Sequence, residues 1–272
     1  MKKYFDIEKI RENITSITDP TGVRAFLIEG KSRAALVDTC CGIGNIKELM
    51  QTLTTLPLTV ICTHGHVDHA GGAYGFEDIY LNEKDFEVVK GHTTIEKRMG
   101  FGRDCGFDCT EDDMIPQKTD VYKPLKDGDV FDLGGITLEC IEMTGHTPGM
   151  TSILIREIKT LILSDACNPF TYMFLPESSS LETLKASLNR LLSGKYDFDT
   201  VWISHGDYLV PKTVIDDVIE CCDEILNGTD DKVPFESMGR LAYVAHRQGE
   251  NGRLDGKCGN VVYPRDIKRN AG

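Results

Sequence analysis

The stretch THGHVDHAGG places three histidines and one aspartate within six positions, from His64 to His69. The chain has 272 residues and only 7 histidines, so this short stretch holds almost half of them. Each imidazole carries two polar nitrogens that need partners, and a hydrophobic core gains nothing from three of them side by side. A bound metal ion accounts for the cluster, because neutral imidazoles and carboxylates are ligands for zinc.

Three later segments repeat the same placement of a polar residue after a short apolar run. They are TGHTPG with His146, TLILSD with Asp165, and TVWISHGD with His205. One tetrahedral zinc ion takes about four ligands, so the full set suits two ions about 3.5–4 Å apart that share a carboxylate. The seven candidate ligands are His64, His66, Asp68, His69, His146, Asp165 and His205. Only His92 and His246 are left outside this set.

The elements that must position these residues are strands and helices in alternation. Ligand sites in layered α/β folds lie where loops leave the ends of strands, and the candidate ligands follow strand-like runs. Two groups of strands, each followed by helices, predict an α/β sandwich of two sheets covered by helices. Strand patterns cover 23–30, 33–40, 58–65, 79–82, 128–135, 136–143, 151–157, 160–165 and 200–207, and helical patterns cover 42–57, 83–90, 181–192 and 214–228.

The motifs THGHVDHAGG, TGHTPG, LSDA and SHGD, in this order, resemble those of the metallo-β-lactamase fold superfamily of metallohydrolases. The resemblance covers roughly residues 20–210 and implies a four-layer αββα fold with the site on one edge. It also implies that His64, His66 and His146 hold one metal ion. A second ion would be held by Asp68, His69 and His205, with Asp165 as the bridging ligand.

The predicted activity is that of a dinuclear zinc-dependent hydrolase. Two Zn²⁺ ions per chain are expected, although the ligand set also fits Fe or Mn. A metal-bound hydroxide would attack a small-molecule ester, thioester or lactone, as in the glyoxalase-II-like and lactonase-like branches that the motifs resemble. Two alternatives remain: a mononuclear iron protein similar to persulfide dioxygenases, and a non-catalytic metal-binding protein.

Several other residues are candidates for roles at the site. Asp68 is expected to orient the nucleophile, and Asn168 or Tyr172 to donate a hydrogen bond to the developing oxyanion, although each also fits a turn or packing role. Phe101 and Phe107 are expected to wall an apolar pocket. Cys105 and Cys109 have a spacing that metal or disulfide sites use, but two cysteines alone are weak evidence. Arg240, Arg247, Arg253 and Lys257 either hold an anionic substrate or form a solvated face.

Length and charge limit the remaining possibilities. We expect one domain over residues 1–272, with a lid insertion at 91–122, which reads as irregular, and a C-terminal extension at 229–272. The net charge of −13 argues against nucleic-acid and anionic-membrane partners, because phosphate binding needs clustered Lys and Arg. The first residues have no apolar signal region, and no apolar run approaches a membrane span, so a cytoplasmic protein with reduced cysteines is expected.

Overall fold

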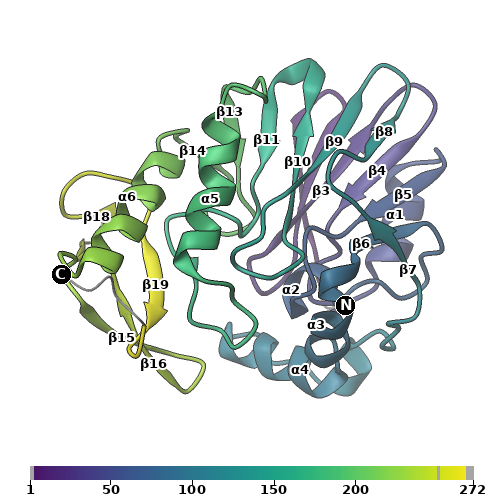
Figure 1. Ribbon diagram of the computed structural model, residues 1–272. Helices are drawn as coiled ribbons and strands as arrows, with labels where there is room; N and C mark the ends of the chain where they lie inside the picture. The colour runs from purple at the N-terminus through teal and green to yellow at the C-terminus, as the bar shows by residue number, and fades with distance from the viewer. Residues whose placement is uncertain (1–2, 250–251, 268–272) are drawn as a thin grey trace.

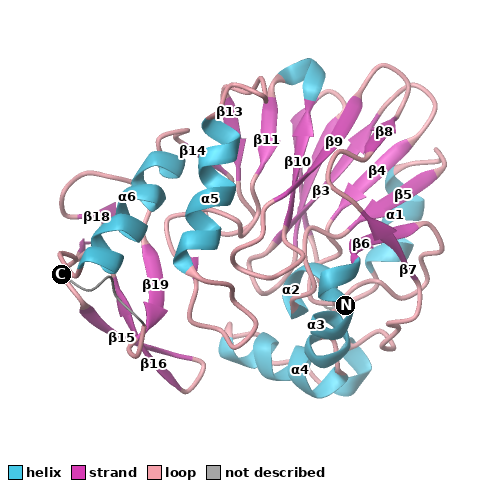
Figure 2. Cartoon of the chain, viewed as in Figure 1, coloured by secondary structure: helices cyan, strands magenta, loops and turns pink. Residues whose placement is uncertain are grey.

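The computed structural model describes residues 3–249 and 252–267, and its centre is a pair of β-sheets that lie face to face (Figures 1 and 2). The first sheet has seven strands in chain order: β1 (Asp6–Arg11), β2 (Ile14–Thr18), β3 (Arg24–Glu29), β4 (Ala34–Val37), β5 (Leu58–Ile61), β6 (Ile79–Asn82) and β7 (Tyr122–Leu125). Strands β1 to β4 pair antiparallel, and β4 to β7 pair parallel. The turn at Gly30–Lys31, between the predicted strands 23–30 and 33–40, joins β3 to β4 as a hairpin.

The second sheet has six strands and a mostly antiparallel order. In spatial order these are β14 (Leu209–Val210), β13 (Thr200–Trp202), β11 (Thr160–Ile162), β10 (Thr151–Ile155), β9 (Thr137–Glu142) and β8 (Val130–Asp132). A 3₁₀ turn, η3 (Arg156–Ile158), connects β10 to β11. Strand β11 pairs parallel with β13, and α5 lies between them in the chain.

Alternation of side chains along the strands explains the layering. In β3, Phe26 and Ile28 belong to the apolar cluster between the two sheets, whereas Ala25 and Leu27 face the opposite side. The side chains of strand β10 alternate in the same way: Ile153 belongs to the inter-sheet cluster, and Leu154 belongs to the cluster on the outer face. Successive side chains of a strand point to opposite faces, so each sheet presents two apolar surfaces that must both be covered.

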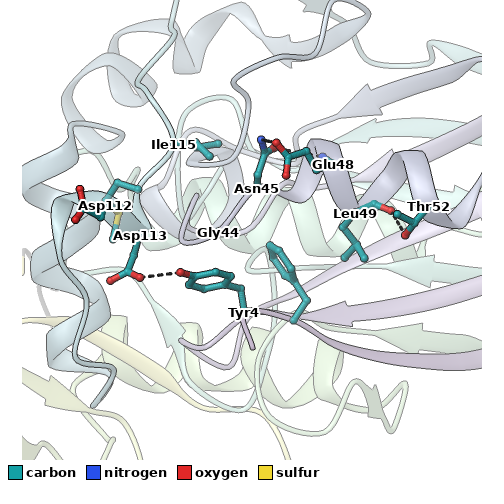
Figure 3. A pocket seen from close by; sticks show the side chains of 11 residues that line it. Tyr4, Gly44, Asn45, Glu48, Leu49, Thr52, Asp112, Asp113 and Ile115 are labelled. Carbon is teal, nitrogen blue, oxygen red and sulfur yellow. Dashed lines mark hydrogen bonds between the residues drawn. The ribbon is translucent and has the colours of Figure 1, made fainter. Parts of the chain in front are cut away.

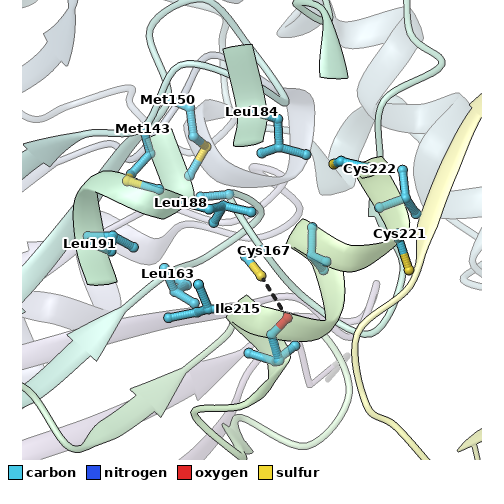
Figure 4. Packing of buried hydrophobic residues seen from close by; sticks show 14 of the residues in the cluster. Met143, Met150, Leu163, Cys167, Leu184, Leu188, Leu191, Ile215, Cys221 and Cys222 are labelled. Atoms are coloured by element: carbon cyan, nitrogen blue, oxygen red, sulfur yellow. Dashed lines mark hydrogen bonds between the residues drawn. The ribbon is translucent and has the colours of Figure 1, made fainter. Parts of the chain in front are cut away.

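Helices cover the two outer faces. Helix α1 (Ile46–Leu53) packs Ile46 and Met50 on the first sheet. Helices α5 (Leu181–Leu192) and α6 (Val214–Asn227) cover the second sheet, and their buried side chains share one apolar cluster with Leu163, directly after β11 (Figure 4). The layers are therefore helix, sheet, sheet, helix, and the predicted αββα fold is confirmed.

Local sequence accounts for where these helices begin and end. The Ser180 side chain accepts a hydrogen bond from the Thr183 N–H and caps α5, whose leucines at helical spacing are buried. Gly228 ends α6 in the left-handed region, with a φ of 75°, which an L side chain rarely adopts. Both helices were predicted within one residue of their observed bounds.

Short helices gather at the edge of the sandwich where the candidate ligands lie (Figure 1). They are α2 (Val67–Ala70), η1 (Glu83–Asp85), α3 (Phe86–His92), α4 (Ile95–Asp104) and η2 (Glu111–Asp113). The expectation of an irregular segment at 91–122 is wrong, because α4 occupies much of it. Arg98 of α4 is fully buried and donates to the carbonyl oxygens of Gly42, Gly71 and Ile115, which fastens this helix to the loop of the histidine motif.

The C-terminal part forms a third, smaller sheet beyond α6 (Figure 2). Its order is β12 (Thr171–Tyr172), β19 (Val261–Pro264), β16 (Arg240–Val244) and β15 (Val233–Ser237), and β17 (Gln248–Gly249) pairs separately with β18 (Gly252–Arg253). Strand β12 pairs parallel with β19, so β19 contacts the loop that follows Asp165. Within the described residues, no helix combines the length and apolar character that a membrane span requires.

Candidate metal centre

The candidate ligands come from four strand ends that meet at one edge of the sandwich. The histidine motif follows β5, and His146 follows β9. Asp165 follows β11, and His205 follows β13. The seven candidate ligands form two groups, and within each group every side chain brings one ligand atom to within 4.8 Å of the others. They are His64, His66 and His146, and Asp68, His69, Asp165 and His205.

In the first group, three imidazole nitrogens converge. His66 Nδ1 lies 3.1 Å from His64 Nε2 and 2.9 Å from His146 Nε2. The other nitrogen of each ring has its own acceptor. His146 Nδ1 donates to the Tyr172 carbonyl at 2.7 Å, and His64 Nδ1 lies 3.1 Å from the Thr63 hydroxyl.

These outer hydrogen bonds fix where the protons sit. His66 Nε2 donates to the Glu177 carboxylate at 2.7 Å, so the three facing nitrogens carry lone pairs and no proton between them. Three lone pairs at such distances repel one another unless a cation lies among them. The donor set therefore fits a divalent metal ion, since imidazole nitrogens with outer carboxylate or carbonyl partners are the usual protein ligands.

The second group contains two carboxylates. Asp165 Oδ2 lies 3.4 Å from His69 Nε2 and 3.2 Å from His205 Nε2, and Asp68 Oδ2 lies 3.5 Å and 3.4 Å from the same two nitrogens. His69 Nε2 is buried and has no hydrogen-bond partner, because its Nδ1 donates to Asp38 instead. A buried polar atom without a partner is costly, and a metal ion would satisfy it.

Asp165 also approaches the first group. Its Oδ2 lies 3.6 Å from His146 Nε2, so one carboxylate oxygen faces histidines of both groups. This placement is the one that a ligand shared between two ions requires.

The two groups differ in charge. Burial lowers the pKa of His64 and His66 and lowers that of His146 to about 4, so the first group is neutral near pH 7. Burial also disfavours a charged His69, but the carboxylates of Asp68, Asp165 and Asp38 outweigh it and raise its pKa. The pKa of Asp165 is held well below its usual value by His205 and His69, although burial acts the other way.

Buried carboxylates behind the ligands hold them in place. Asp38 accepts from His69 Nδ1 at 2.9 Å and from both the N–H and the hydroxyl of Thr63. Asp85 accepts from the Gly65 and Gly149 N–H groups and from Thr147, and thus joins the two loops that carry the first group. Neither Asp38 nor Asp85 was predicted from the sequence, although Asp38 follows an apolar strand run as the other candidates do.

Two non-glycine residues at the centre have strained backbones. Asp38 has a φ of 64° and Ser164, directly before Asp165, has a φ of 51°. Such conformations cost free energy in L residues and persist only where the surroundings enforce them. Here they turn the carboxylates of Asp38 and Asp165 into the site.

A third group of possible ligands adjoins the first: His66, His92 and Glu177. The rings of His66 and His92 stack with centroids 4.6 Å apart, and His92 Nε2 lies 3.2 Å from Glu177. His92 lies outside the ligand set predicted from the sequence, and Glu177 was not among the predicted site residues. His246, the other histidine left out, lies away from these groups and contacts Glu224 at 2.5 Å.

A cavity of about 1700 Å³ opens above the two groups. His66, Asp68, His146, Asp165 and His205 form part of its lining. Other lining residues come from α4, from the loop after Asp165, and from 237–240, 248–249, 252 and 256–258 in the C-terminal part. Arg240 and Lys257 line it, whereas Arg247 and Arg253 do not.

Only one of the two predicted pocket residues, Phe101 and Phe107, lines the cavity. Phe101 lines the cavity, but Phe107 packs on Cys41, Ile43 and Val67 and is not part of the lining. The expectation that Phe107 walls the pocket is therefore wrong, because Phe107 lies beyond the end of α4 and packs on these buried residues, whereas Phe101 of α4 lines the cavity. Both rings contact the same small cluster of buried residues.

Asn168 and Tyr172 both line the cavity but differ in how their polar atoms are used. Asn168 Oδ1 accepts from the Phe170 N–H at 2.8 Å, and its Nδ2 lies 3.5 Å from Asp165 Oδ1. The Tyr172 ring packs edge-to-face on Phe174. The turn role that the sequence left open for Asn168 is thus present.

The cysteines form no site of their own. All ten are free, and none belongs to a possible ligand group among residues 3–249 and 252–267. Cys109 is buried with its Sγ against the Met99 carbonyl, and Cys105 is exposed. The metal or disulfide hypothesis for this pair is not supported.

A second cavity, of about 450 Å³, lies near the N-terminus (Figure 3). Tyr4 donates to Asp113 at 2.8 Å across it and packs on Gly44, where a Cβ atom would lie 2.5 Å from the tyrosine ring. Its lining contains no member of the ligand groups. The larger cavity is therefore the one associated with the metal centre.

Comparison with known proteins agrees with this geometry. The metallo-beta-lactamase superfamily profile matches residues 18–205, which is more than half of the chain. The chain therefore belongs to this superfamily, as the resemblance of its motifs indicated. The possible ligand groups lie within the matched residues, and the C-terminal sheet lies almost wholly outside them.

Individual relatives are distant. The acyl-coenzyme A thioesterase MBLAC2 of Homo sapiens is 24% identical over 157 residues, a match that spans 52% of this chain and 56% of the relative. The hydroxyacylglutathione hydrolase GloC of Haemophilus influenzae is 26% identical over 199 residues, covering 68% of this chain and 85% of the relative. The solved metallo-beta-lactamase from Pontibacter korlensis has a TM-score of 0.60 at 17% identity, over 80% of this chain and 98% of that one, and supports the fold alone.

Proposed function

We propose that this protein is a dinuclear zinc hydrolase of small-molecule thioesters, within the wider class of esters and lactones. The observation that carries the proposal is the meeting of two ligand groups at one end of a large cavity. Both relatives named above act on thioesters, by their names, and their chemistry favours thioesters within this class.

His64, His66 and His146 would hold one ion, and Asp68, His69 and His205 the other, with Asp165 shared between them. Bound there, divalent ions would supply a water nucleophile at neutral pH and polarise the substrate carbonyl. The chain itself provides orientation. Asp38 and Glu177 hold the rings of His69 and His66, so that their free nitrogens face the site.

The remaining polar residues have separate proposed roles. Asp68 lines the cavity and orients the nucleophile. Asn168 holds Asp165 through its Nδ2 and acts as a positioning residue, since its Oδ1 is already used in the turn. Tyr172 is the better oxyanion donor of the two, because it lines the cavity and its ring is fixed by packing.

A substrate panel tests the proposal. The zinc-loaded protein is assayed on acyl thioesters, lactones, phosphodiesters and β-lactams, and we expect thioesters to have the highest kcat/KM. Hydrolysis of phosphodiesters or β-lactams in preference to thioesters would overturn the substrate class. Oxygen consumption on glutathione persulfide by a protein containing one iron would overturn the hydrolase itself.

A further inference from the structure

Glu177 is a carboxylate that lies beside the first ligand group and is not one of the seven expected metal ligands. It lies in the loop between β12 and α5, and its side chain is only 15% exposed. Its Oε1 accepts from His66 Nε2 at 2.7 Å and from His92 Nε2 at 3.2 Å. Both donors also line the cavity.

The bond to His66 decides which nitrogen of that ring is available. His66 differs from the other two histidines of its group because it presents Nδ1, and not Nε2, to them. A carboxylate that accepts from Nε2 keeps the proton there and leaves Nδ1 as a lone pair. Without Glu177, the ring could rotate or change its tautomer, since no other acceptor is recorded for Nε2.

His92 contacts the same carboxylate oxygen as His66. Its ring stacks on that of His66 with an interplanar angle of 28°. The two rings and the shared Oε1 therefore form a closed arrangement in which neither the carboxylate nor the His66 ring turns freely.

The loop of Glu177 is also tied to the other loop of the first group. The Ser178 hydroxyl donates to the His146 carbonyl at 3.1 Å, and the Ser179 N–H donates to the Gly145 carbonyl at 2.8 Å. Three consecutive residues, 177–179, thus contact the side chain of His66 and the backbone on which His146 sits. This segment sets the distance between two ligands that are far apart in the sequence.

We propose that Glu177, held by His92, is a positioning residue that fixes the tautomer and orientation of His66 for metal binding. The proposal rests on the proposed function only in taking His64, His66 and His146 as metal ligands. Outer-shell partners of histidine ligands typically change metal affinity 10- to 100-fold. We expect an effect of that size, confined to the ion of the first group.

The test uses two variants and a matched control. Glu177→Ala removes the acceptor, and Glu177→Gln keeps an acceptor oxygen while it removes the charge. Glu224→Gln is the control, because Glu224 makes the same type of bond, 2.5 Å long, to His246 Nε2, away from the ligand groups. Unfolding temperatures of the apo proteins establish that each variant folds.

The readouts are Zn²⁺ affinity, measured in competition with a chromophoric chelator, and the visible absorption spectrum of the Co²⁺-substituted protein. For Glu177→Ala we expect the affinity of one of the two ions to fall about 10- to 100-fold, with an altered Co²⁺ spectrum. Glu177→Gln should lose less, and Glu224→Gln should match the parent protein.

Parent-like affinities and spectra in both Glu177 variants would overturn the proposal. If Glu177→Ala does not fold, the result for Glu177→Gln decides. A parent protein that binds two ions but hydrolyses no thioester would overturn the proposed function and leave the role of Glu177 standing, so the two failures are distinguishable.

Discussion

The floor and the wall of the large cavity are built in opposite ways. The floor consists of the two ligand groups, whose members are at least nine-tenths buried except for His205. The wall consists of Phe101 on α4, the loop from Asn168 to Glu177, Leu209 on β14, and residues 237–240, 248–249, 252 and 256–258 of the C-terminal part. Several wall residues are exposed, among them Leu209 and Met238, which are 59% and 55% accessible.

This difference indicates that the floor and the wall of the cavity have different roles. Most floor residues are held by a second polar group, as His69 is by Asp38 and His66 by Glu177, so their geometry is fixed before any substrate arrives. Phe101 and the loop from Asn168 to Glu177 lie within the residues that the superfamily profile matches, whereas the C-terminal wall residues lie outside them. We infer that the floor determines whether the reaction occurs and that the wall determines which substrate is chosen.

The largest expected effect is that of Asp165→Ala, because Asp165 faces both ligand groups. We expect kcat to fall about 10³-fold or more and metal content to fall, since a metal-assisted hydrolysis loses several kcal/mol and each 1.4 kcal/mol is tenfold. Thioester kinetics and elemental analysis check this. Asp207→Ala, an exposed carboxylate that also lines the cavity, is the control. Full metal content and activity in Asp165→Ala would show that the floor is wrongly assigned.

A smaller effect is expected for Asp38→Asn, because Asp38 is not a member of either ligand group but contacts His69 Nδ1. The amide can no longer hold His69 as a carboxylate does, so affinity for the ion of the second group should fall about 10- to 100-fold. Asp217→Asn is a matched control, because Asp217 is equally buried and accepts two backbone N–H bonds away from the ligands. Equal zinc affinities in the two variants would show that Asp38 does not support metal binding through His69.

The wall is tested by Phe101→Ala. Since an apolar pocket discriminates by about 1–3 kcal/mol per methylene, we expect the ratio of kcat/KM between long and short acyl thioesters to change about tenfold with metal content unchanged. Phe107→Ala is the control, because Phe107 packs on the same cluster without lining the cavity. If both variants keep the parental ratio, α4 does not shape the pocket.

The smallest effect is expected from Arg240→Ala at the rim. Exposed charges are screened by solvent and salt, so KM for an anionic thioester should rise about two- to threefold at low salt and change little at high salt. Arg247, exposed but outside the lining, gives the matched variant Arg247→Ala. An equal rise in KM for both would indicate a general charge effect and not a contact at the cavity.

The sequence predicted the fold where local pattern and tertiary packing agree. Helices α5 and α6 have leucine and isoleucine faces with clear start and stop signals, and most strands of the two sheets are apolar runs. Strand β1 was missed because its side chains are mostly exposed and charged, and α4 was missed because IEKRMGFGRD has two glycines and a weak apolar face. The domain limits and the lid role of 91–122 stay predictions.

The seven candidate ligands could be predicted from the sequence because they follow strands whose ends lie at one edge of the sandwich. Residues at four such ends meet because β9, β11 and β13 run in the same direction within the second sheet and β5 of the first sheet ends at the same edge. Asp38 also follows an apolar strand run, β4. Glu177 and His92 gave no signal, because their approach to His66 depends on how a loop and the end of α3 fold over the sheet edge. Phe101 and Phe107 could not be told apart without the orientation of α4.

Metal stoichiometry coupled to activity tests the central claim most directly. The protein is stripped with a chelator, titrated with Zn²⁺, and assayed for thioester hydrolysis at each step, with elemental analysis of the purified chain alongside. The account predicts two zinc ions per chain, no hydrolysis by the stripped protein, and recovery of activity as both ions bind. One iron per chain, with no gain of hydrolysis on adding zinc, would contradict it.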